Sequence, residues 1–295
     1  MPAPYNSKTT GSELVQELAD QIKGKVILTS GVTPGGLGAQ FVELIATAQP
    51  ALLILTGRNT SKPQQTADAI AKAHPDVKTR ILKLDLGSLA VVREAAAELN
   101  SWDDVPVIDV LVNNAAIMAT DFALSPDGFE SQFATNHLGH FLFTNLIINK
   151  VLAAKEPRIV SVSSDGHRLS PVRFDDNDFH GGENYNRWQA YGQSKTANML
   201  FALSLAEKLG EKRGLVTVSL HPGVIGGTNL GTHIDWTNTG PDSLQYVERF
   251  LGNKEGWSTF QWKTHDEGVA THVFASFDQS LQGEMMFFEK FPCFS

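Results

Sequence analysis

Short apolar runs alternate along this chain with longer segments in which apolar residues recur every three or four positions. The short runs have the length of buried β-strands, and the longer segments have the period of helices that cover a sheet. The runs are VILTS at 26–30, ALLILT at 51–56, TRILKLDL at 79–86, VIDVLVNN at 107–114, RIVSVSS at 158–164 and LVTVSLHPG at 215–223. This alternation predicts right-handed crossovers and a mostly parallel sheet.

The alternation continues through most of the chain, without a repeat or a low-complexity linker. We therefore expect a single-domain Rossmann fold over residues 25–295, an α/β doubly wound parallel sheet of about seven strands with helices on both faces. Residues 1–24 are expected to form an accessory helix. Thr10 and Glu13 have the spacing of a capping box there, and Gly24 ends the apolar face.

Two stretches interrupt the alternation, at about 165–187 and about 224–262. Both are rich in Gly, Asn and Asp. Long loops inside a compact domain are often walls of a substrate site, so we expect these two to be substrate loops. Surface excursions without a role are the alternative.

Composition narrows the classes of function. The 295 residues carry a formal net charge of −8, and 42% are hydrophobic, which is enough for a large core. The acidic balance argues against a nucleic-acid-binding surface. Cys293 is the single cysteine, and no apolar stretch approaches the roughly 18 residues of a membrane span. We expect a cytoplasmic protein without a membrane span, a disulfide or a nucleic-acid partner.

Acidic residues and histidines gather at two places, but neither pattern predicts a metal site. Asp175, Asp176 and Asp178 lack the spacing of an EF-hand loop. His137 and His140 are three residues apart and have no evident third ligand. A solvated loop and helix packing explain them, so we expect no metal.

Candidate site residues follow the ends of the predicted strands. In a doubly wound sheet, ligands bind at this edge, near the point where the strand order reverses. The residues that follow successive strands are Ser30 to Gly38, Arg58, Asp85, Asn113 and Asn114, Ser163 and Ser164, and Pro222 with Gly223.

Tyr191 and Lys195 in YGQSK form the most informative pair. A spacing of four residues on a helix places both side chains on one face, about one turn apart. A nearby ammonium favours the phenolate, so the phenol could exchange protons nearer to neutral pH. An exposed helix pair without chemistry is the alternative reading of YxxxK.

Together these motifs resemble the short-chain dehydrogenase/reductase family. Asn136 in NHLGH, Ser164 in VSS, and Tyr191 with Lys195 carry the resemblance, together with NNAA and HPG. The similarity runs from about residue 24 to about residue 283. DGFESQFATNHLGHFLFT is most similar to the retinol dehydrogenase and WW-domain oxidoreductase subgroup, and the loop GVTPGGLG resembles fungal members.

The resemblance implies a catalytic set. Tyr191 would donate a proton to a carbonyl oxygen during reduction, and Ser164 would hydrogen-bond that oxygen. Lys195 would lower the pKa of Tyr191 and hold the nicotinamide ribose. Asn136 would keep a water in a proton relay behind Lys195. Strand alternation places Ser163 on the opposite face from Ser164.

The resemblance also implies where the cofactor binds. The family pattern T-G-x-x-x-G-x-G aligns Ser30 and Gly31 with its first two positions, and Gly36, Leu37 and Gly38 with its last three, with one extra residue between. Gly36 and Gly38 would open a helix whose amides face the pyrophosphate. The other residues expected at the cofactor are Asp85, Leu86, Asn114, Ala115, Tyr191, Lys195, Pro222 and Gly223.

Arg58 in LTGRN predicts the choice of cofactor. Enzymes that prefer NAD usually place an acidic residue near the end of the second strand, whereas a cation there can pair with a 2′-phosphate. No acidic residue lies between Leu53 and Asp68. We therefore expect NADP(H), with Asn59 assisting Arg58. A solvated turn residue is the alternative for Arg58.

We expect an NADPH-dependent carbonyl reductase or alcohol dehydrogenase that acts on CH–OH groups. The alternatives are a non-redox enzyme on the same scaffold, such as a dehydratase, epimerase or cyclase, and a nucleotide-binding regulator without turnover. The complete catalytic set argues against the regulator.

The substrate is expected to be an apolar or aromatic ketone or alcohol of specialised metabolism. Large aromatic residues are available to line its site: Phe174, Phe179, Trp188, Trp236, Phe250 and Trp257. His167 is a further candidate contact. By resemblance, the protein is expected to form a homodimer through helices at 127–152 and 188–210.

Overall fold

A computed structural model describes residues 5–251, 261–281 and 286–288. Its main sheet contains β1 (Val26–Ser30), β2 (Leu52–Gly57), β3 (Thr79–Lys83), β4 (Val110–Asn113), β5 (Arg158–Val162), β6 (Val216–Leu220) and β9 (Met286–Phe288). The order is β3-β2-β1-β4-β5-β6-β9 and every pair is parallel. Six strands make the body of the sheet, and the three-residue β9 lies at its edge. The strand order reverses between β1 and β4, as in a doubly wound Rossmann fold.

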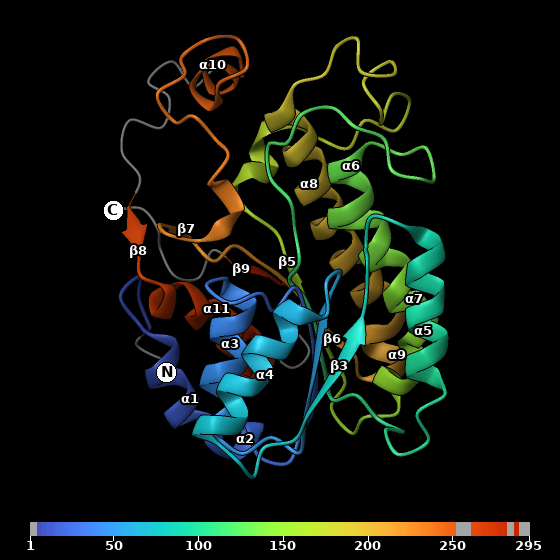
Figure 1. Ribbon diagram of the computed structural model, residues 1–295, viewed down its shortest axis with the longest axis vertical. Coiled ribbons are helices and arrows are strands. Elements are labelled where there is room, and N and C mark those ends of the chain that lie inside the picture. The colour runs from blue at the N-terminus through green and yellow to red at the C-terminus, as the bar shows by residue number, and fades with distance from the viewer. Residues whose placement is uncertain (1–4, 252–260, 282–285, 289–295) are drawn as a thin grey trace.

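Helices cover both faces of the sheet (Figure 1). One face carries α3 (Leu37–Ala46), α4 (Ser61–Ala73) and α11 (His265–Phe277), and the other carries α5 (Leu89–Asn100), α7 (Gly139–Leu152) and α8 (Arg187–Leu205). Strand alternation divides the core accordingly: Ile27 packs into the first layer and Leu28 into the second. Both residues are fully buried. The expected two-faced architecture is confirmed.

The N-terminal segment forms α1 (Gly11–Glu17) and α2 (Ala19–Ile22). Thr10 caps α1 and forms the capping box with Glu13. The helix packs on α11, where the Ser12 hydroxyl and backbone N–H both donate to Asp266. A Cβ on Gly11 would lie 2.6 Å from Val269, so glycine permits this close approach.

The segments that interrupt the alternation lie at the carboxyl end of the sheet, with α10 at the top of Figure 1. Their elements are a 3₁₀ turn (Asp165–Leu169), β7 (Val224–Ile225), a 3₁₀ turn (Asn229–Gly231), α10 (Leu244–Phe250) and β8 (Trp262–Lys263). β7 and β8 pair as a separate parallel two-stranded sheet. These loops therefore stand over the edge where ligands bind in such sheets.

The remaining elements are short. They are α6 (Ser131–Phe133), π-helical turns at Ala134–Leu138 and Ala206–Gly210, α9 (Glu211–Arg213) and a 3₁₀ turn at Gln279–Leu281. Within the described residues, no helix combines the length and the apolar character that a bilayer crossing requires.

Candidate active site

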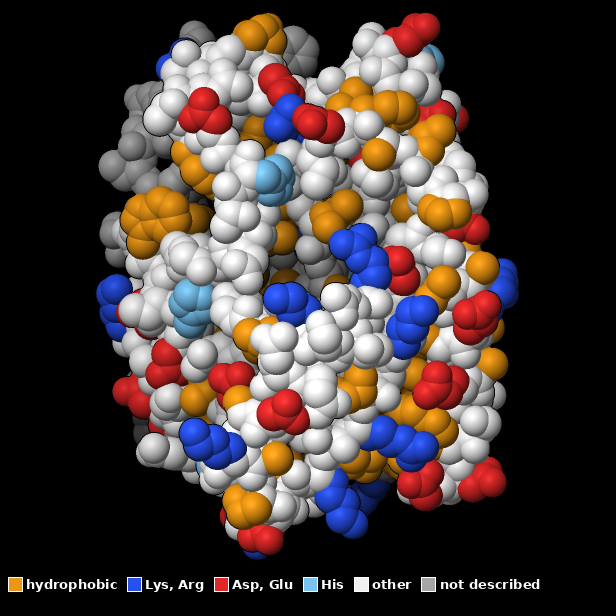
Figure 2. Space-filling model, in the orientation of Figure 1, with side chains coloured by type: hydrophobic (Ala, Val, Ile, Leu, Met, Phe, Trp, Pro, Cys, Tyr) orange, Lys and Arg blue, Asp and Glu red, His pale blue; other side chains and the backbone are white. Residues whose placement is uncertain are grey.

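A cavity of about 910 Å³ opens at the carboxyl ends of the central strands. The space-filling view shows this face hollowed beneath the loops (Figure 2). The predicted site residues that line it are Gly31, Gly36, Leu37, Arg58, Asp85, Leu86, Asn114, Ala115, Ser164, Tyr191, Lys195, Pro222 and Gly223. Ser30, Gly38, Asn59 and Asn136 do not line it. One edge of the sheet thus brings together most of the residues expected there.

Tyr191 and Lys195 lie one turn apart on α8 and face the same end of the cavity. Asn186 caps this helix by accepting from the N–H groups of Trp188 and Gln189. Both site side chains are buried, and Nζ of Lys195 lies 5.4 Å from the centre of the Tyr191 ring. Nζ donates to the Val162 carbonyl at 3.0 Å, which fixes the ammonium beneath the end of β5.

Burial sets the protonation of this pair. It raises the pKa of Tyr191 to about 12, against a smaller opposite effect from hydrogen bonding with Ser164. It lowers the pKa of Lys195 to about 7. The net shift is therefore upward and not the lowering expected beside Lys195, because loss of hydration is its largest cause. Tyr191 therefore holds its proton at neutral pH and can donate it.

The serines after β5 have separate partners. The Ser163 hydroxyl donates to the carbonyl of Lys195 at 2.8 Å, which ties the strand to α8. Ser164 begins the 3₁₀ turn, accepts from the Gly166 N–H at 3.0 Å and interacts with Tyr191. A Cβ on Gly166 would lie 2.8 Å from the Tyr191 ring, so glycine allows the ring to approach. Ser164 is thus the serine beside the phenol.

Asn136 lies behind the cavity, in the π-helical turn before α7. Its amide oxygen accepts from the Ile117 N–H and its amide nitrogen donates to the Ile117 carbonyl, both at 2.8 Å. The same nitrogen donates to Ser194 on α8 at 3.0 Å. Both polar atoms of the side chain are engaged, so Asn136 fixes the loop after β4. Its part in a water relay stays a prediction.

Ser30 joins the end of β1 to the loop after β4, and its expected contact with the cofactor stays a prediction. Its hydroxyl accepts from the N–H groups of Asn114 at 2.9 Å and Ala115 at 3.0 Å, and lies 2.8 Å from Nε2 of His140. Nδ1 of His140 lies 3.0 Å from the Asn136 carbonyl and must donate to it, so Nε2 accepts the Ser30 proton. Burial lowers the pKa of His140 to about 4, which keeps the ring neutral.

The glycine loop between β1 and α3 has two kinds of glycine. Gly38 does not line the cavity, and a Cβ there would lie 2.5 Å from the Gly31 carbonyl oxygen, so glycine permits this close approach. Its expected amide contact with the pyrophosphate stays a prediction. Gly36 is the N-cap of α3, and no described side chain caps that helix end. Pro34 and Gly35 do not line the cavity and contact a distant segment: Asn229 donates to the Pro34 carbonyl at 3.3 Å, and His265 lies 3.3 Å from that of Gly35.

Arg58 follows β2, is exposed and lines the cavity. It forms no ion pair with another described residue. Asn59 does not line the cavity, and its side-chain oxygen accepts from the Ser61 N–H at 2.9 Å, just before α4. Its expected assistance to Arg58 stays a prediction. Asp85 accepts from the Gly87 N–H at 3.0 Å, which holds the turn after β3 at the cavity.

Apolar residues form the upper wall of the cavity. They include Met118, Leu169, Trp188, Trp236 and Leu244. Trp188 and Trp236 were expected at the substrate; nothing in the local sequence pattern indicated the other three, which come from separate elements.

Two of the expected aromatic residues are absent from this wall. Phe174 is 81% exposed, and Phe179 is buried beneath the guanidinium of Arg173. The Phe250 side chain and Trp257 lie outside the described residues. His167 does not line the cavity; its Nδ1 lies 2.8 Å from the Ser164 carbonyl.

His221 is a residue that the sequence analysis missed. It lines the cavity beside Pro222, and its Nδ1 is buried without a hydrogen-bond partner among the described residues. Burial lowers its pKa to about 4. The motif HPG marked the position, but only the fold places the ring against the cavity.

A family model described as short chain dehydrogenase matches residues 25–175. The chain belongs to the short-chain dehydrogenase/reductase family. Members of this oxidoreductase family bind nicotinamide cofactors. Short-chain dehydrogenase TIC 32 B, chloroplastic, of Brassica napus is 33% identical over 95% of this chain and 83% of its own. Retinol dehydrogenase 14 of Mus musculus is 33% identical over 88% and 75%, and prx1 of Penicillium rubens is 34% identical over 95% and 78%.

Solved structures share the fold of this short-chain dehydrogenase/reductase. A short-chain dehydrogenase from Salmonella enterica superposes with a TM-score of 0.68 at 20% identity, over 92% of this chain and 97% of that one. One from Escherichia coli CFT073, solved with NADPH, gives 0.63 at 19% identity, over 89% and 95%.

Proposed function

We propose that the protein is an NADPH-dependent carbonyl reductase that also catalyses the reverse oxidation of secondary alcohols. The observation that carries this proposal is the grouping of Ser164, Tyr191 and Lys195 at one end of the cavity. A phenol that holds its proton at neutral pH, beside a hydroxyl and a buried amine, suits proton transfer to a carbonyl oxygen.

The other end of the cavity fits a dinucleotide. The uncapped N-terminus of α3 offers free amides to a pyrophosphate. A Cβ on Gly31 would lie 2.7 Å from Ala115, so glycine lets the loop after β1 approach the loop after β4 closely at the base of the site. Arg58 provides a cation without a described ion-pair partner, suited to a 2′-phosphate. The bound cofactor would supply the hydride to the carbonyl carbon.

The chain's own residues would manage the proton. Ser164 would donate a hydrogen bond to the substrate oxygen and hold it near the Tyr191 hydroxyl. Tyr191 would give its proton to that oxygen as negative charge develops there. Lys195 would stabilise the phenolate that remains, since its ammonium lies beside the ring. Asn136 would hold a water of the proton relay, as in the family pattern.

A single substitution tests this chemistry. Tyr191→Phe removes the proton donor without changing the shape of the helix. We expect a loss in kcat of about 10²- to 10⁴-fold for reduction of a ketone at saturating NADPH. Tyr246→Phe changes an exposed tyrosine outside the cavity and should leave turnover intact. Equal rates in the two variants contradict the assignment of Tyr191.

Assembly and location are part of the proposal. Phe141 and Leu146 on α7, with Leu200 and Leu203 on α8, are large apolar side chains exposed on the two helices expected to form a homodimer. Sedimentation analysis of Leu200→Glu against the unchanged protein tests this surface, with a monomer expected for the variant. The expected role in specialised metabolism and the cytoplasmic location stay predictions, and the TIC 32 relatives are named as chloroplastic.

A further inference from the structure

Two tryptophans face the cavity from different elements. Trp188 lies in the first turn of α8, three residues before Tyr191, and Trp236 lies in the loop before α10. We propose that they form a subsite for an aromatic ring of the substrate, and that Arg187 holds the two sides of this subsite together. The inference rests on the proposed ketone reduction and names its substrate class as aryl ketones.

The geometry of the pair suits a flat ring. The two ring centres are 5.8 Å apart, with their planes at 51° to each other. Trp188 is almost completely buried, whereas Trp236 is 49% exposed. Tilted aromatic rings at this spacing can take a third ring in offset or edge contact. Trp236 rests on Gly231, where a Cβ would lie only 3.1 Å from its ring.

The position of the pair relative to Tyr191 indicates the form of the ligand. Three residues along a helix correspond to about 4.5 Å, and such residues share a face. Trp188 and Tyr191 both line the cavity, so a substrate with its carbonyl at the Tyr191 hydroxyl has a substituent that can reach Trp188. We assign that substituent as an aromatic ring attached to the carbonyl carbon, because the wall beside Tyr191 carries the tryptophan pair.

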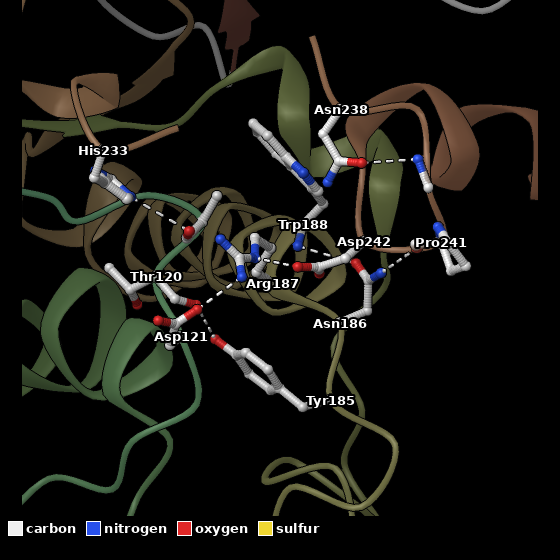
Figure 3. A network of polar contacts seen from close by, with 12 residues as sticks. Thr120, Asp121, Tyr185, Asn186, Arg187, Trp188, His233, Asn238, Pro241 and Asp242 are labelled. Atoms are coloured by element: carbon white, nitrogen blue, oxygen red, sulfur yellow. Dashed lines mark hydrogen bonds and ion pairs between the residues drawn. The ribbon is translucent and has the colours of Figure 1, made fainter. Parts of the chain in front are cut away.

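Arg187 joins the segments that carry the subsite (Figure 3). Its terminal nitrogen donates to Asp121 in the loop after β4 at 2.7 Å. Its Nε lies 2.7 Å from Asp242 in the segment before α10. One guanidinium at the start of α8 thus binds both loops that flank the mouth of the cavity.

Neighbouring hydrogen bonds also join these loops to one another and to the start of α8 (Figure 3). Asn186 donates to the Pro241 carbonyl at 3.3 Å, and Tyr185 donates to that of Thr120 at 3.0 Å. His233 lies 2.9 Å from the Met118 carbonyl, which ties the Trp236 loop to the loop after β4. The position of Trp236 relative to Trp188 is therefore set by polar contacts between loops.

Exposure of the ion pairs argues for a positioning role. Asp121 is 89% exposed and Asp242 is 47% exposed at the side chain, against 27% for Arg187. Ion pairs in contact with water add little to stability. Loss of Arg187 should therefore disturb the geometry of the subsite more than the folded state.

The test compares two ketones with NADPH: acetylnaphthalene, which carries a flat ring system, and octanone, which does not. We expect Trp236→Ala to raise KM for acetylnaphthalene about 3- to 10-fold and to leave octanone nearly unchanged. Arg187→Gln should raise the same KM by several-fold with an unchanged thermal midpoint. It should add little further when combined with Trp236→Ala, because both act through one subsite.

Matched controls are available on this chain. Phe174→Ala removes an exposed aromatic ring outside the cavity. Arg80→Gln removes an exposed ion pair with Asp104, also outside it. Neither should change KM for either ketone. The inference is overturned if Trp236→Ala or Arg187→Gln changes both ketones by the same factor, or neither.

A binding measurement separates this inference from the proposed reduction. Acetylnaphthalene should quench tryptophan fluorescence of the unchanged protein, and the quenching should weaken in Trp236→Ala. Binding of this kind without turnover of either ketone would refute the reductase and keep the aromatic subsite. Turnover of octanone without any Trp236-dependent binding of acetylnaphthalene would refute the subsite and keep the reductase.

Discussion

Replacing Ser30 by alanine tests how the backbone at Asn114 and Ala115, which line the cavity, is held in place. The hydroxyl accepts hydrogen bonds from Asn114 at 2.9 Å and Ala115 at 3.0 Å, and donates to His140 at 2.8 Å. Alanine leaves two donors and one acceptor without partners inside the protein. Each such group costs about 1–3 kcal/mol, and small shifts recover part of this. We expect Ser30→Ala to lower the free energy of unfolding by about 2–5 kcal/mol.

Urea unfolding followed by circular dichroism measures this loss, and Ser161→Ala is its control. Ser161 lies on β5 and is as buried as Ser30, but its hydroxyl has no hydrogen-bond partner among the described residues. The same atoms are removed in both variants, so the difference between them isolates the hydrogen bonds. Ser161→Ala should be neutral or slightly stabilising, since it removes an unsatisfied buried group.

NADPH affinity gives a second measurement. Asn114 and Ala115 line the cavity, so a shift of their backbone in Ser30→Ala should weaken cofactor binding. Ser161→Ala should bind NADPH as the unchanged protein does. Equal stability losses in the two variants would refute the reasoning, because burial alone would then account for both.

Three further substitutions or conditions have defined outcomes. Arg58→Gln should raise KM for NADPH about 10- to 100-fold in steady-state assays, because it removes a charged hydrogen bond to the 2′-phosphate. KM for NADH should stay unchanged. Equal changes in the two KM values would contradict the role of Arg58 at the 2′-phosphate. Gly223 has φ +96, and a Cβ there would lie 2.7 Å from Lys263. Gly223→Ala should lose about 1–2 kcal/mol in urea unfolding, unlike the helical control Gly210→Ala. Burial lowers the pKa of His140 and of His272 to about 4, from an ordinary value of 6.5. The unfolded chain therefore takes up their protons first, and unfolding free energy should fall by about 1–3 kcal/mol for each histidine as pH drops from 6.5 towards 4. His272→Gln should make this fall smaller, and an equally steep fall in that variant would contradict the assignment.

The sheet and the placement of the site were predictable because they depend on local patterns. Apolar runs of strand length, separated by helical periods, allow few topologies once crossovers are right-handed. Parallel strands then bring their carboxyl ends to one edge, so Arg58, Ser164 and Pro222 had to meet there. The spacing of Tyr191 and Lys195 fixed their common face in the same way.

Local patterns do not reveal hydrogen-bond partners that are distant in sequence, or competition from near neighbours. The hydroxyl of Ser30 is taken by residues 84 to 110 positions away, which no local pattern reveals. The side-chain oxygen of Asn59 accepts a hydrogen bond from the backbone N–H of Ser61, two residues along the chain. The pKa of Tyr191 is set mainly by burial, which the sequence suggests only in general terms, so its upward shift could not be worked out beforehand.

The glycine loop, lengthened by one residue, connects the expected cofactor end of the cavity with the segment that leads to its apolar wall. Pro34 and Gly35 contact Asn229 and His265, and Asn229 begins the turn that leads towards Trp236. A displacement of this loop by one ligand would reach, through these contacts, the segment that leads to the wall for the other. Any coupling of this kind is reciprocal, so each ligand would change the affinity for the other by the same factor in either order of addition.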